Sequence, residues 1–418
     1  MNERMVDVAV IGAGAAGLAA AAVTANAGCS TVVIDREKFP GGILRQCIHN
    51  GFGLRYFKEE LTGPEYAGRA AGKCLDAGAE LWLDHTVSNL KRTDDGLLVL
   101  DVLSAETGVT RLTAKAVMLA MGCRERNRGN LAIPGSRPAG VFTAGTAQKL
   151  LNSVGVLPGK SAVIVGSGDI GLIMARRLTW CGIKVKAVVE IMPHPSGLTR
   201  NIVQCLNDFD IPLYLGHAVV NICGKNRVSG VDIAPLADGI PQDEKTFHID
   251  CDTLLFSVGL IPENELSVTA GVTLDLATGG AKVTSGYETD VPGIFAAGNV
   301  LHVHDLVDFV SEEAERAAKG VLQYLKKETT ADNCRAAAGK NLKYVVPGSC
   351  RAGEKQLFSF RPLIVTDGGK LTAKCGDDVV FTQRIPFVRP AEMIAVEVDV
   401  PEKAAGITFE LHPGEVSK

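Results

Sequence analysis

The chain has 418 residues, of which 46% are hydrophobic and 22% are charged, and its formal net charge is −4. This length predicts two or three domains, and the apolar content is sufficient for a sizeable core. The small negative charge argues against nucleic acid and anionic membranes as partners, because both attract strongly basic surfaces.

The N-terminal residues MNERMVD lack the basic stretch and hydrophobic core of a secretory signal. The apolar run from Val8 to Ala25 is rich in glycine and alanine, and it predicts a strand, a turn and a helix rather than a membrane span. No transmembrane segment is therefore expected, and peripheral membrane association remains open.

Eleven cysteines are scattered along the chain, and no two are closer than 16 residues. This spacing excludes a CxxC redox pair and a CxxC-type zinc site, so no bound metal is expected. Scattered, unpaired cysteines are typical of a reducing compartment, which predicts a cytoplasmic protein.

A glycine fingerprint follows the first predicted strand. The stretch Val6–Ile11, VDVAVI, predicts a buried parallel strand, and it leads into Gly12-Ala-Gly14-Ala-Ala-Gly17 and then into a helix-forming run. The first glycine permits a tight turn, the second allows close approach of a pyrophosphate, and the third lets the helix pack on the strand. The helix N-terminus offers N–H groups and a positive dipole end to phosphates. Asp35, 23 residues after Gly12, ends the next strand and is expected to accept a ribose hydroxyl.

The same pattern recurs 154 residues later. The strand SAVIV precedes Gly166-Ser-Gly168-Asp-Ile-Gly171, and a second strand ends on Glu190, 24 residues after Gly166. One chain is therefore expected to bind two dinucleotides. Glu190 is followed directly by Ile-Met-Pro and not by an arginine. A carboxylate there repels a 2′-phosphate, so NAD(H) is favoured over NADP(H).

Two further stretches resemble a known superfamily. Leu119-Ala-Met-Gly122 resembles the ATG-type motif of two-dinucleotide flavoproteins, and TDVPGIFAAGN, from Thr289 to Asn299, resembles their second FAD motif. Together with both fingerprints, these motifs resemble the pyridine nucleotide-disulfide oxidoreductase superfamily over about residues 5–327. The resemblance implies FAD on the first fingerprint and NAD(P)H on the second. Asn299 stands where the family usually has Asp; both accept a hydrogen bond from a ribitol hydroxyl, but Asn carries no charge.

The expected fold class is α/β, with two Rossmann-like dinucleotide-binding domains and a small C-terminal β-rich module. The NAD-binding domain, residues 126–271, is expected as an insertion in an FAD-binding domain of residues 1–125 and 272–330. The polar, alanine-rich stretch Thr329–Gly339 predicts a linker. Runs of β-branched residues between prolines and glycines predict the module at residues 340–418. Two interpretations of this module stay open, a subunit-docking surface and a cap that completes the fold.

The resemblance also implies which residues contact each cofactor. The FAD candidates are Gly12, Gly14, Ala15, Ala16, Gly17, Asp35, Arg36, Gly41, Gly42, Gln46, Val87, Ala120, Gly122, Gly298 and Asn299, and the NAD candidates are Gly166, Gly168, Asp169, Ile170, Gly171, Glu190 and Gly259. A helix expected from Asp305 or Ser311 points its positive end at the flavin in this family. Of the two histidines before it, His302 and His304, either could bond the flavin or shuttle a proton, although local satisfaction is favoured. His304 is kept as a catalytic candidate.

The stretch GGILRQCIHNGFG contains Cys47, 30 residues after Gly17. Disulfide reductases hold two neighbouring cysteines against the flavin, and Gly41 and Gly42 resemble the glycine pair that brings the chain close to FAD. Cys47 is thus a candidate peroxide-reducing thiolate, half of a disulfide with a distant cysteine, or an unreactive packed thiol. The packed thiol is favoured. With an inert Cys47, electrons would leave the flavin for a partner protein, a quinone or a small acceptor.

A finer resemblance concerns function. Residues from Arg124 to Gly145, RERNRGNLAIPGSRPAGVFTAG, resemble NAD-linked flavoprotein subunits of opine oxidases, hydrogen cyanide synthase and heterotetrameric sarcosine oxidase. GGILRQCIHNGFG, with LTGPEYA, resembles a flavoprotein companion of anaerobic glycerol-3-phosphate dehydrogenase-like proteins. These resemblances imply an FAD-dependent NAD(H) oxidoreductase that serves as the electron-transfer subunit of a complex, whose dehydrogenase partner oxidises the small-molecule substrate. The alternatives are a stand-alone NADH oxidase or peroxidase, or a thioredoxin-reductase-like enzyme, using Cys47, and a nucleotide-binding scaffold without turnover.

Overall fold

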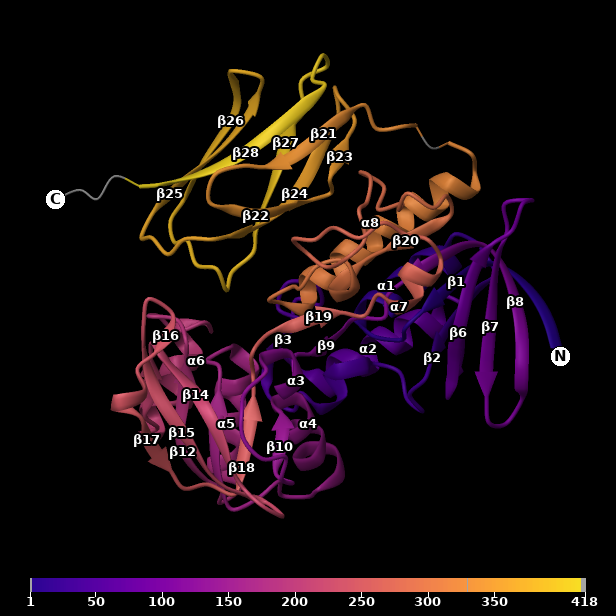
Figure 1. The fold of residues 1–418 in the computed structure, drawn as a ribbon. Helices are drawn as coiled ribbons and strands as arrows, with labels where there is room; N and C mark the ends of the chain where they lie inside the picture. Colours follow the sequence, from indigo (N-terminus) through magenta and orange to yellow (C-terminus); the bar gives the residue numbers. More distant parts are fainter. Residues whose placement is uncertain (1, 329, 415–418) are drawn as a thin grey trace. The chain divides into compact units, whose positions relative to one another are not determined.

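The computed structural model describes residues 2–328 and 330–414. Residue 1 and residues 415–418, which the expected domains include, lie outside the described residues, as does residue 329 at the start of the expected linker. The chain divides into two compact units (Figure 1). The larger unit comprises Met1–Cys123 and Pro262–Lys418, and the inserted unit comprises Arg124–Ile261.

A mixed sheet forms the centre of the larger unit. Its strands follow the order β5-β2-β1-β8-β7-β6, and β20 also pairs with β8. Pairing is parallel from β5 to β8 and between β8 and β20, whereas β6, β7 and β8 form an antiparallel meander. The strands are β1 (Asn2–Ile11), β2 (Thr31–Asp35), β5 (Glu80–Leu83), β6 (His85–Arg92), β7 (Leu98–Ser104), β8 (Gly108–Leu119) and β20 (Ile294–Ala296).

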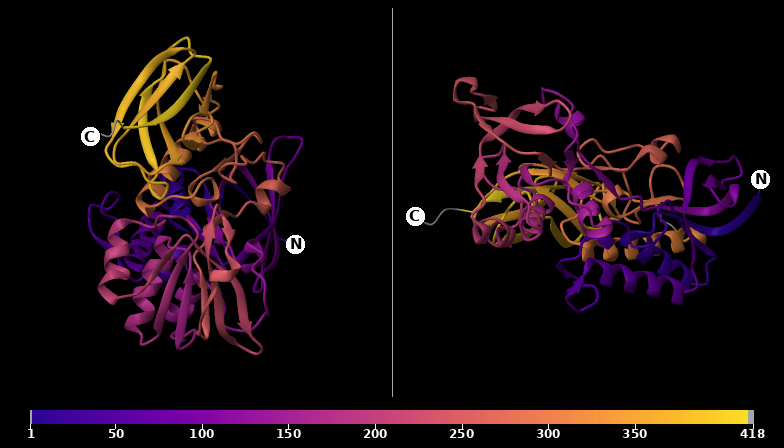
Figure 2. Two further views of the ribbon diagram at one scale, coloured as in Figure 1. Left: turned by 60° about the vertical axis from the view of Figure 1, so that its left-hand side comes forward. Right: turned by 90° about the horizontal axis from the view of Figure 1, so that it is seen from below.

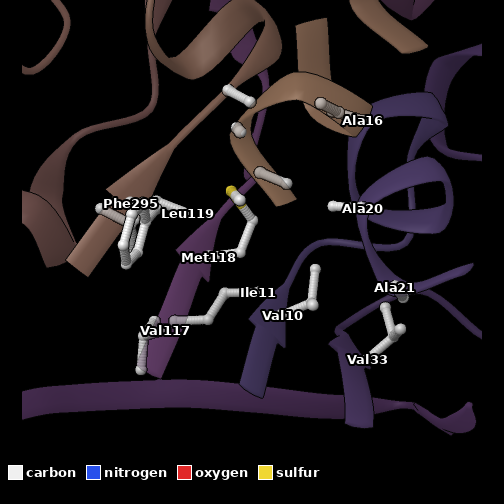
Figure 3. Close-up of a cluster of buried hydrophobic side chains, with 14 of the residues drawn as sticks. Val10, Ile11, Ala16, Ala20, Ala21, Val33, Val117, Met118, Leu119 and Phe295 are labelled. Atoms are coloured by element: carbon white, nitrogen blue, oxygen red, sulfur yellow. The ribbon is translucent and has the colours of Figure 1, made fainter. Parts of the chain in front are cut away.

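The core of this unit combines β-branched strand residues with alanines. Val10, Val33 and Val117 come from three different strands of the sheet and are buried, and the helical residues Ala20 and Ala21 pack against them (Figure 3). Strands buried on both faces read as continuous apolar runs, which is why the first strand was recognisable in the sequence.

Helices pack on the sheet and on one another. The principal helices of the larger unit are α1 (Ala15–Asn26), α2 (Gly63–Asp76) and α8 (Val307–Leu325), and α1 contacts both of the others. Helix α8 begins between the two start positions expected from the sequence. Among the described residues, no helix combines the length and the apolar character needed to cross a bilayer.

The inserted unit has a second parallel sheet, in the order β10-β18-β11-β12-β13. Its strands are β10 (Val141–Thr143), β11 (Ser161–Val165), β12 (Lys184–Glu190), β13 (Leu213–Leu215) and β18 (Thr253–Phe256). Its helices are α3 (Arg128–Leu131), α4 (Ala144–Lys149), α5 (Asp169–Trp180) and α6 (Thr199–Cys205). A separate antiparallel ladder contains β14 (His217–Gly224), β15 (Val228–Ala237), β16 (Ile240–Pro241) and β17 (Phe247–Ile249). Two Rossmann-like units confirm the expected α/β fold class.

The C-terminal module, coloured orange to yellow in Figures 1 and 2, consists of two sheets with the orders β23-β21-β28-β25-β26 and β22-β24-β27. Phe358, Phe360 and Phe409 are fully buried between them, with ring centroids 4.6 to 6.4 Å apart. The strands are β21 (Cys334–Ala338), β22 (Leu342–Val346), β23 (Ser349–Cys350), β24 (Lys355–Pro362), β25 (Gly369–Cys375), β26 (Asp378–Ile385), β27 (Ile394–Asp399) and β28 (Gly406–Pro413).

The prediction of a linker at Thr329–Gly339 is wrong in its second half. Strand β21 lies inside it and pairs with both β28 and β23. The sequence CRAAA has side chains too small and too similar to reveal a two-residue alternation. Its strand conformation comes from the hydrogen bonds of its neighbours, which a local reading of the sequence does not contain.

Candidate functional site

The first glycine loop forms a cradle at the carboxyl end of β1. Gly12 has φ of +108°, and a Cβ there would lie 2.3 Å from the carbonyl oxygen of Ala120. A Cβ on Gly17 would lie 1.8 Å from the carbonyl oxygen of Gly12. Only a glycine at position 17 therefore lets helix α1 pack this closely against the turn after β1. Gly14, in contrast, faces open space. No side chain caps α1, and its first turn has no acidic residue, so its N–H groups and dipole are available to an anion.

Asp35 closes one side of this cradle. Its carboxylate accepts the N–H of Ala13 at 2.6 Å and the N–H of Glu37 at 2.8 Å. These two bonds fix the carboxylate beside the glycine loop, at the end of β2, where a ribose hydroxyl donor would meet it. Arg36, the next residue, is exposed.

The Gly41-Gly42 turn packs directly against the glycine loop of the first cradle. The N–H of Gly41 donates to the carbonyl of Ala13 at 2.7 Å, and a Cβ on Gly42 would lie 3.2 Å from the Cα of Gly14. Gln46 is buried in the short 3-10 helix η1 (Gly42–Gln46) that follows. The turn thus brings the chain against the cradle, whereas Val87 lies in β6 as a member of the hydrophobic core.

The two remaining FAD motifs reach the same edge of the sheet. Ala120 follows β8 and donates its N–H to Ile11, and the N–H of Ala297, after β20, donates to Leu119. Gly298, with φ of +77°, then passes so close to helix α1 that a Cβ would lie 2.9 Å from the Cβ of Ala16. Gly122, also at positive φ, faces open space.

Asn299 is held by the loop that it begins. Its Oδ1 accepts the N–H of His304 at 3.0 Å, and its Nδ2 lies 3.6 Å from the Sγ of Cys123. The second lone pair of Oδ1 is compatible with the ribitol contact that the resemblance implies.

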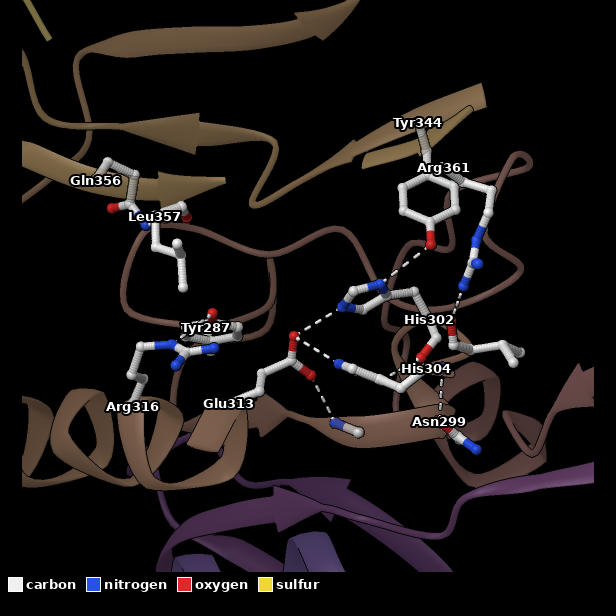
Figure 4. A network of polar contacts seen from close by, with 12 residues as sticks. Tyr287, Asn299, His302, His304, Glu313, Arg316, Tyr344, Gln356, Leu357 and Arg361 are labelled. Carbon is white, nitrogen blue, oxygen red and sulfur yellow. Dashed lines mark hydrogen bonds and ion pairs between the residues drawn. The ribbon is translucent and has the colours of Figure 1, made fainter. Parts of the chain in front are cut away.

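Beneath this loop lies a buried polar cluster of His302, His304 and Glu313 (Figure 4). Both imidazole Nε2 atoms approach Oε2 of Glu313, at 2.7 Å for His302 and 3.4 Å for His304. The other carboxylate oxygen accepts the N–H of Gly298 at 2.8 Å. Although burial alone would raise the pKa of Glu313, the two imidazoles hold it well below its ordinary value. The cluster therefore contains a carboxylate that favours its ionised form although it is buried.

The C-terminal module contributes two side chains to this region (Figure 4). The hydroxyl of Tyr344 lies 3.3 Å from Nδ1 of His302. The guanidinium of Arg361 donates to the carboxylate of Asp305 at 2.6 Å and to the carbonyl of Val303 at 2.7 Å. The module is thus bonded to the loop that links Asn299 to α8.

Sequence reasoning missed Tyr344, Arg361 and Asp308. Asp308, 3% exposed, accepts the N–H groups of Gly53 and Tyr56 and so ties the start of α8 to the segment after Cys47. No motif linked these residues, because their partners lie 42 to 255 residues away in the sequence. The only signal in the sequence was the residue type, because arginine and aspartate commonly form ion pairs when buried.

Cys47 follows η1, and its Sγ lies 3.4 Å from the carbonyl of Ile43. Burial raises the pKa of its thiol to about 12. None of the eleven cysteines forms a disulfide. His49 bonds the carbonyl of Asn50 through Nδ1. This environment favours a protonated thiol at neutral pH, not the thiolate that peroxide chemistry requires.

The second glycine loop repeats the first. Gly166 has φ of +90°, and a Cβ there would lie 2.1 Å from the carbonyl oxygen of Ser257. Gly171 packs against the side chain of the same serine. Gly259, with φ of +97°, follows β18 on the adjoining turn. The N-cap residue Gly168 has no side chain to cap α5, and in its first turn the N–H of Gly171 donates to Oγ of Ser257 at 3.0 Å. The preceding N–H groups of this turn face the glycine loop, where a pyrophosphate would bind.

The two acidic candidates of the second cradle are occupied within the inserted unit. Glu190, 4% exposed, accepts hydrogen bonds from the N–H and the hydroxyl of Ser167 at 2.9 and 2.6 Å. Asp169 accepts from Leu198 and Asn201 at 2.8 and 2.6 Å, and Ile170 beside it is half-buried. Through these two bonds to Ser167, Glu190 stabilises the glycine loop.

Both cradles, their order and their spacing match a known family model. Residues 6–321 match the model described as pyridine nucleotide-disulphide oxidoreductase. The chain belongs to this family. FAD-dependent pyridine nucleotide oxidoreductases of this family use FAD and NAD(P)H, and the protein is such an enzyme.

Curated relatives include both components of larger complexes and single enzymes. Hydrogen cyanide synthase subunit HcnB of Pseudomonas protegens is 27% identical over 70% of this chain and 65% of its own length. An opine oxidase subunit of Rhizobium meliloti strain 1021 is 26% identical over 88% and 82%. Thioredoxin reductase of Bacillus subtilis is 26% identical over 72% and 88%. The chain thus spans just under two thirds of HcnB.

Among solved structures, T. acidophilum thioredoxin reductase has a TM-score of 0.64 at 25% identity, covering 78% of this chain and 100% of its own. L-proline dehydrogenase from P. horikoshii has a TM-score of 0.55 at 18% identity, covering 78% of this chain and 59% of its own, and it shares the fold.

The residues of the first cradle fit FAD. Gly12 and Gly17 permit the tight loop, Gly14 leaves room for the pyrophosphate, the uncapped α1 supplies N–H donors, and Asp35 supplies an acceptor. When bound, the flavin supplies hydride transfer with the nicotinamide. The chain's own residues bind, orient and set the electrostatics around that chemistry.

We predict that Gly12→Ala destroys FAD binding, because its Cβ would overlap the carbonyl of Ala120. Gly28→Ala is the matched control: Gly28 also has positive φ, +84°, but a Cβ there meets open space. The control should lose about 1 kcal/mol of stability from backbone strain and keep its flavin. The flavin-to-protein absorbance ratio of the purified variants measures the result, and equal flavin loss in both would contradict the prediction.

We predict that Cys47 resists alkylation and that Cys47→Ser leaves NADH-driven flavin reduction unchanged. With a pKa of about 12, fewer than about one in ten thousand Cys47 thiols is ionised at pH 7.5. Iodoacetamide labelling of native protein, read by peptide mass spectrometry at pH 7.5, should find Cys47 unmodified, whereas labelling after denaturation should modify it. Rapid labelling of native Cys47 would restore it as a redox candidate.

Proposed function

We propose that the protein is the electron-transfer flavoprotein subunit of a dehydrogenase complex. In this proposal it transfers hydride between NAD(H) and FAD, and a partner subunit oxidises the organic substrate. The observation that carries the proposal is the state of its cysteines. No two cysteines are close in sequence, none forms a disulfide, and burial keeps Cys47 protonated. Electrons from the flavin therefore need an acceptor outside this chain.

The named relatives support the same division of labour. HcnB and the opine oxidase protein are, by their names, subunits of larger enzymes. Thioredoxin reductases resemble this chain over a comparable stretch, but a shared pair of cradles is common to both groups. The lack of two cysteines close together in the sequence argues against disulfide reduction by a neighbouring cysteine pair.

The substrate class follows only from resemblance. We propose a glycerol-3-phosphate dehydrogenase-like partner, with opines and amino acids as the next candidates. The acceptor is proposed to be the partner's own redox group, because burial keeps Cys47 protonated. The transfer of hydride from nicotinamide to the flavin itself needs no acid–base residue of this chain.

The experiment that tests this function has two parts. Anaerobic mixing of the FAD-loaded protein with NADH should bleach the visible flavin band within seconds. Affinity purification of the chain from its source should then bring down a dehydrogenase subunit that reoxidises the bleached flavin. A flavin that stays oxidised in NADH would exclude NAD turnover. Rapid reoxidation by peroxide or a disulfide substrate, lost in Cys47→Ser, would replace the proposal with a Cys47 enzyme.

We predict a preference for NADH over NADPH, because Glu190 ends β12 and the next three residues, Ile-Met-Pro, contain no arginine to bind a 2′-phosphate. Stopped-flow reduction should give a lower apparent Kd for NADH, by about tenfold, equivalent to about 1.4 kcal/mol. Ile191→Arg, at an exposed position next to Glu190, should narrow this difference. Trp180→Arg, also exposed, is the control and should leave it unchanged. Equal affinities in the parent protein would contradict the prediction.

A further inference from the structure

The hydrogen-bonding roles in the cluster of His302, His304 and Glu313 can be assigned from its neighbours. Nδ1 of His304 lies 2.9 Å from the backbone carbonyl of His302, and a carbonyl only accepts, so this Nδ1 carries a proton. Nε2 of the same ring faces Oε2 of Glu313 at 3.4 Å. In a neutral ring that Nε2 would direct a lone pair at a carboxylate. A second proton on His304 converts this repulsion into an ion pair.

His302 differs, because its partner can change roles. Its Nε2 donates to Glu313 at 2.7 Å, and its Nδ1 lies 3.3 Å from the hydroxyl of Tyr344. A hydroxyl both donates and accepts, and its hydrogen rotates freely. Neutral His302 accepts from Tyr344, and charged His302 donates to it. The same heavy-atom positions therefore hold either one or two imidazolium charges.

The surrounding groups favour neutral His302 in the resting cluster. Burial lowers the pKa of His302, His304 and Arg361 lower it further, and Glu313 opposes these effects. Burial raises the pKa of Tyr344, so its hydroxyl keeps its proton. The groups facing the cluster from neighbouring elements are Tyr344 of β22, Arg361 of β24 with its partner Asp305, and Tyr287 with Arg316 of α8.

The cluster is bonded directly to the turn that closes the first cradle. Oε1 of Glu313 accepts the N–H of Gly298, and the N–H of His304 donates to Asn299. Gly298 in turn packs against Ala16 in the first turn of α1. A charge that appears in the cradle is therefore close to the cluster in a buried, weakly screened environment.

We propose that His302, His304 and Glu313 form a proton store that gains one proton when the cofactor in the first cradle is reduced. A hydride, two electrons and one proton, converts the bound flavin to its reduced anion. Solvent supplies a separate proton, which enters through the Tyr344 hydroxyl and forms an N–H bond at Nδ1 of His302. The added positive charge stabilises the added negative charge. His302, His304 and Glu313 are positioning residues, and Tyr344 links the C-terminal module to their protonation.

The test is the pH dependence of the midpoint potential of the bound flavin, measured by spectroelectrochemical titration of the full-length holoprotein. One extra proton per two electrons steepens the dependence by about 30 mV per pH unit. Glu313→Gln should remove this extra slope, because it removes the charge that holds the imidazolium. Glu315→Gln, on the same helix but bonded to Lys73 at 3.0 Å, is the matched control and should retain it. The titration needs neither NADH nor a partner, so its failure is distinguishable from failure of the proposed function.

Tyr344→Phe keeps the proposal testable if Glu313→Gln does not fold or bind flavin. It retains the ring but removes the only atom that changes hydrogen-bonding role, and it should also lose the extra slope. A wild-type slope in Tyr344→Phe would overturn the proposal, as would a parent protein without the extra slope. Elemental analysis provides a further check, because stoichiometric metal lost in His304→Asn would identify the cluster as a metal site instead.

Discussion

The close approach of Gly12 to the end of β8 is the constraint on which the larger unit depends. A side chain at Gly12 would overlap the carbonyl of Ala120. Parallel pairing of β1 with β8 and of β8 with β20 makes three chain segments end at one edge. Residues near positions 12, 120 and 298 therefore meet, although almost 300 residues separate the first from the last. The cradle exists because these strands run in the same direction and their turns contain glycine where backbone meets backbone.

Polar bonding extends this edge into the C-terminal module. Arg361 is bonded to Asp305, and Tyr344 reaches His302, so strands of the module hold the loop between Asn299 and α8. Burying these charges is favourable only when each finds a partner, which makes the loop, the helix and the module mutually dependent. Two side chains of the module are thus bonded to the loop between Asn299 and α8.

The chemistry of the site is divided between what the cofactors supply and what the chain supplies. The chain provides two glycine loops at helix N-termini, acids at the ends of the neighbouring strands, and a buried cluster of ionisable groups. A thiolate is missing from this set, since burial disfavours the ionised form of Cys47. The two cradles and the protonated Cys47 are the basis of the electron-transfer role that we propose.

The sequence by itself determined the α/β class, the family and the use of FAD and NAD(P)H. These features are encoded locally, in strand-turn-helix segments whose glycines and acids recur at set spacings, and the family model confirms them. The sequence predicted a linker where β21 lies, because the alanines of this strand show no alternation of polar and apolar side chains. Only the tertiary structure decided how the ionisable groups are paired. Nothing in the sequence linked Glu313 to His302 or the N–H of Gly298, or His302 to Tyr344. Such contacts depend on which surfaces pack together, because a buried charge finds its partner through the fold and not through its neighbours in the chain.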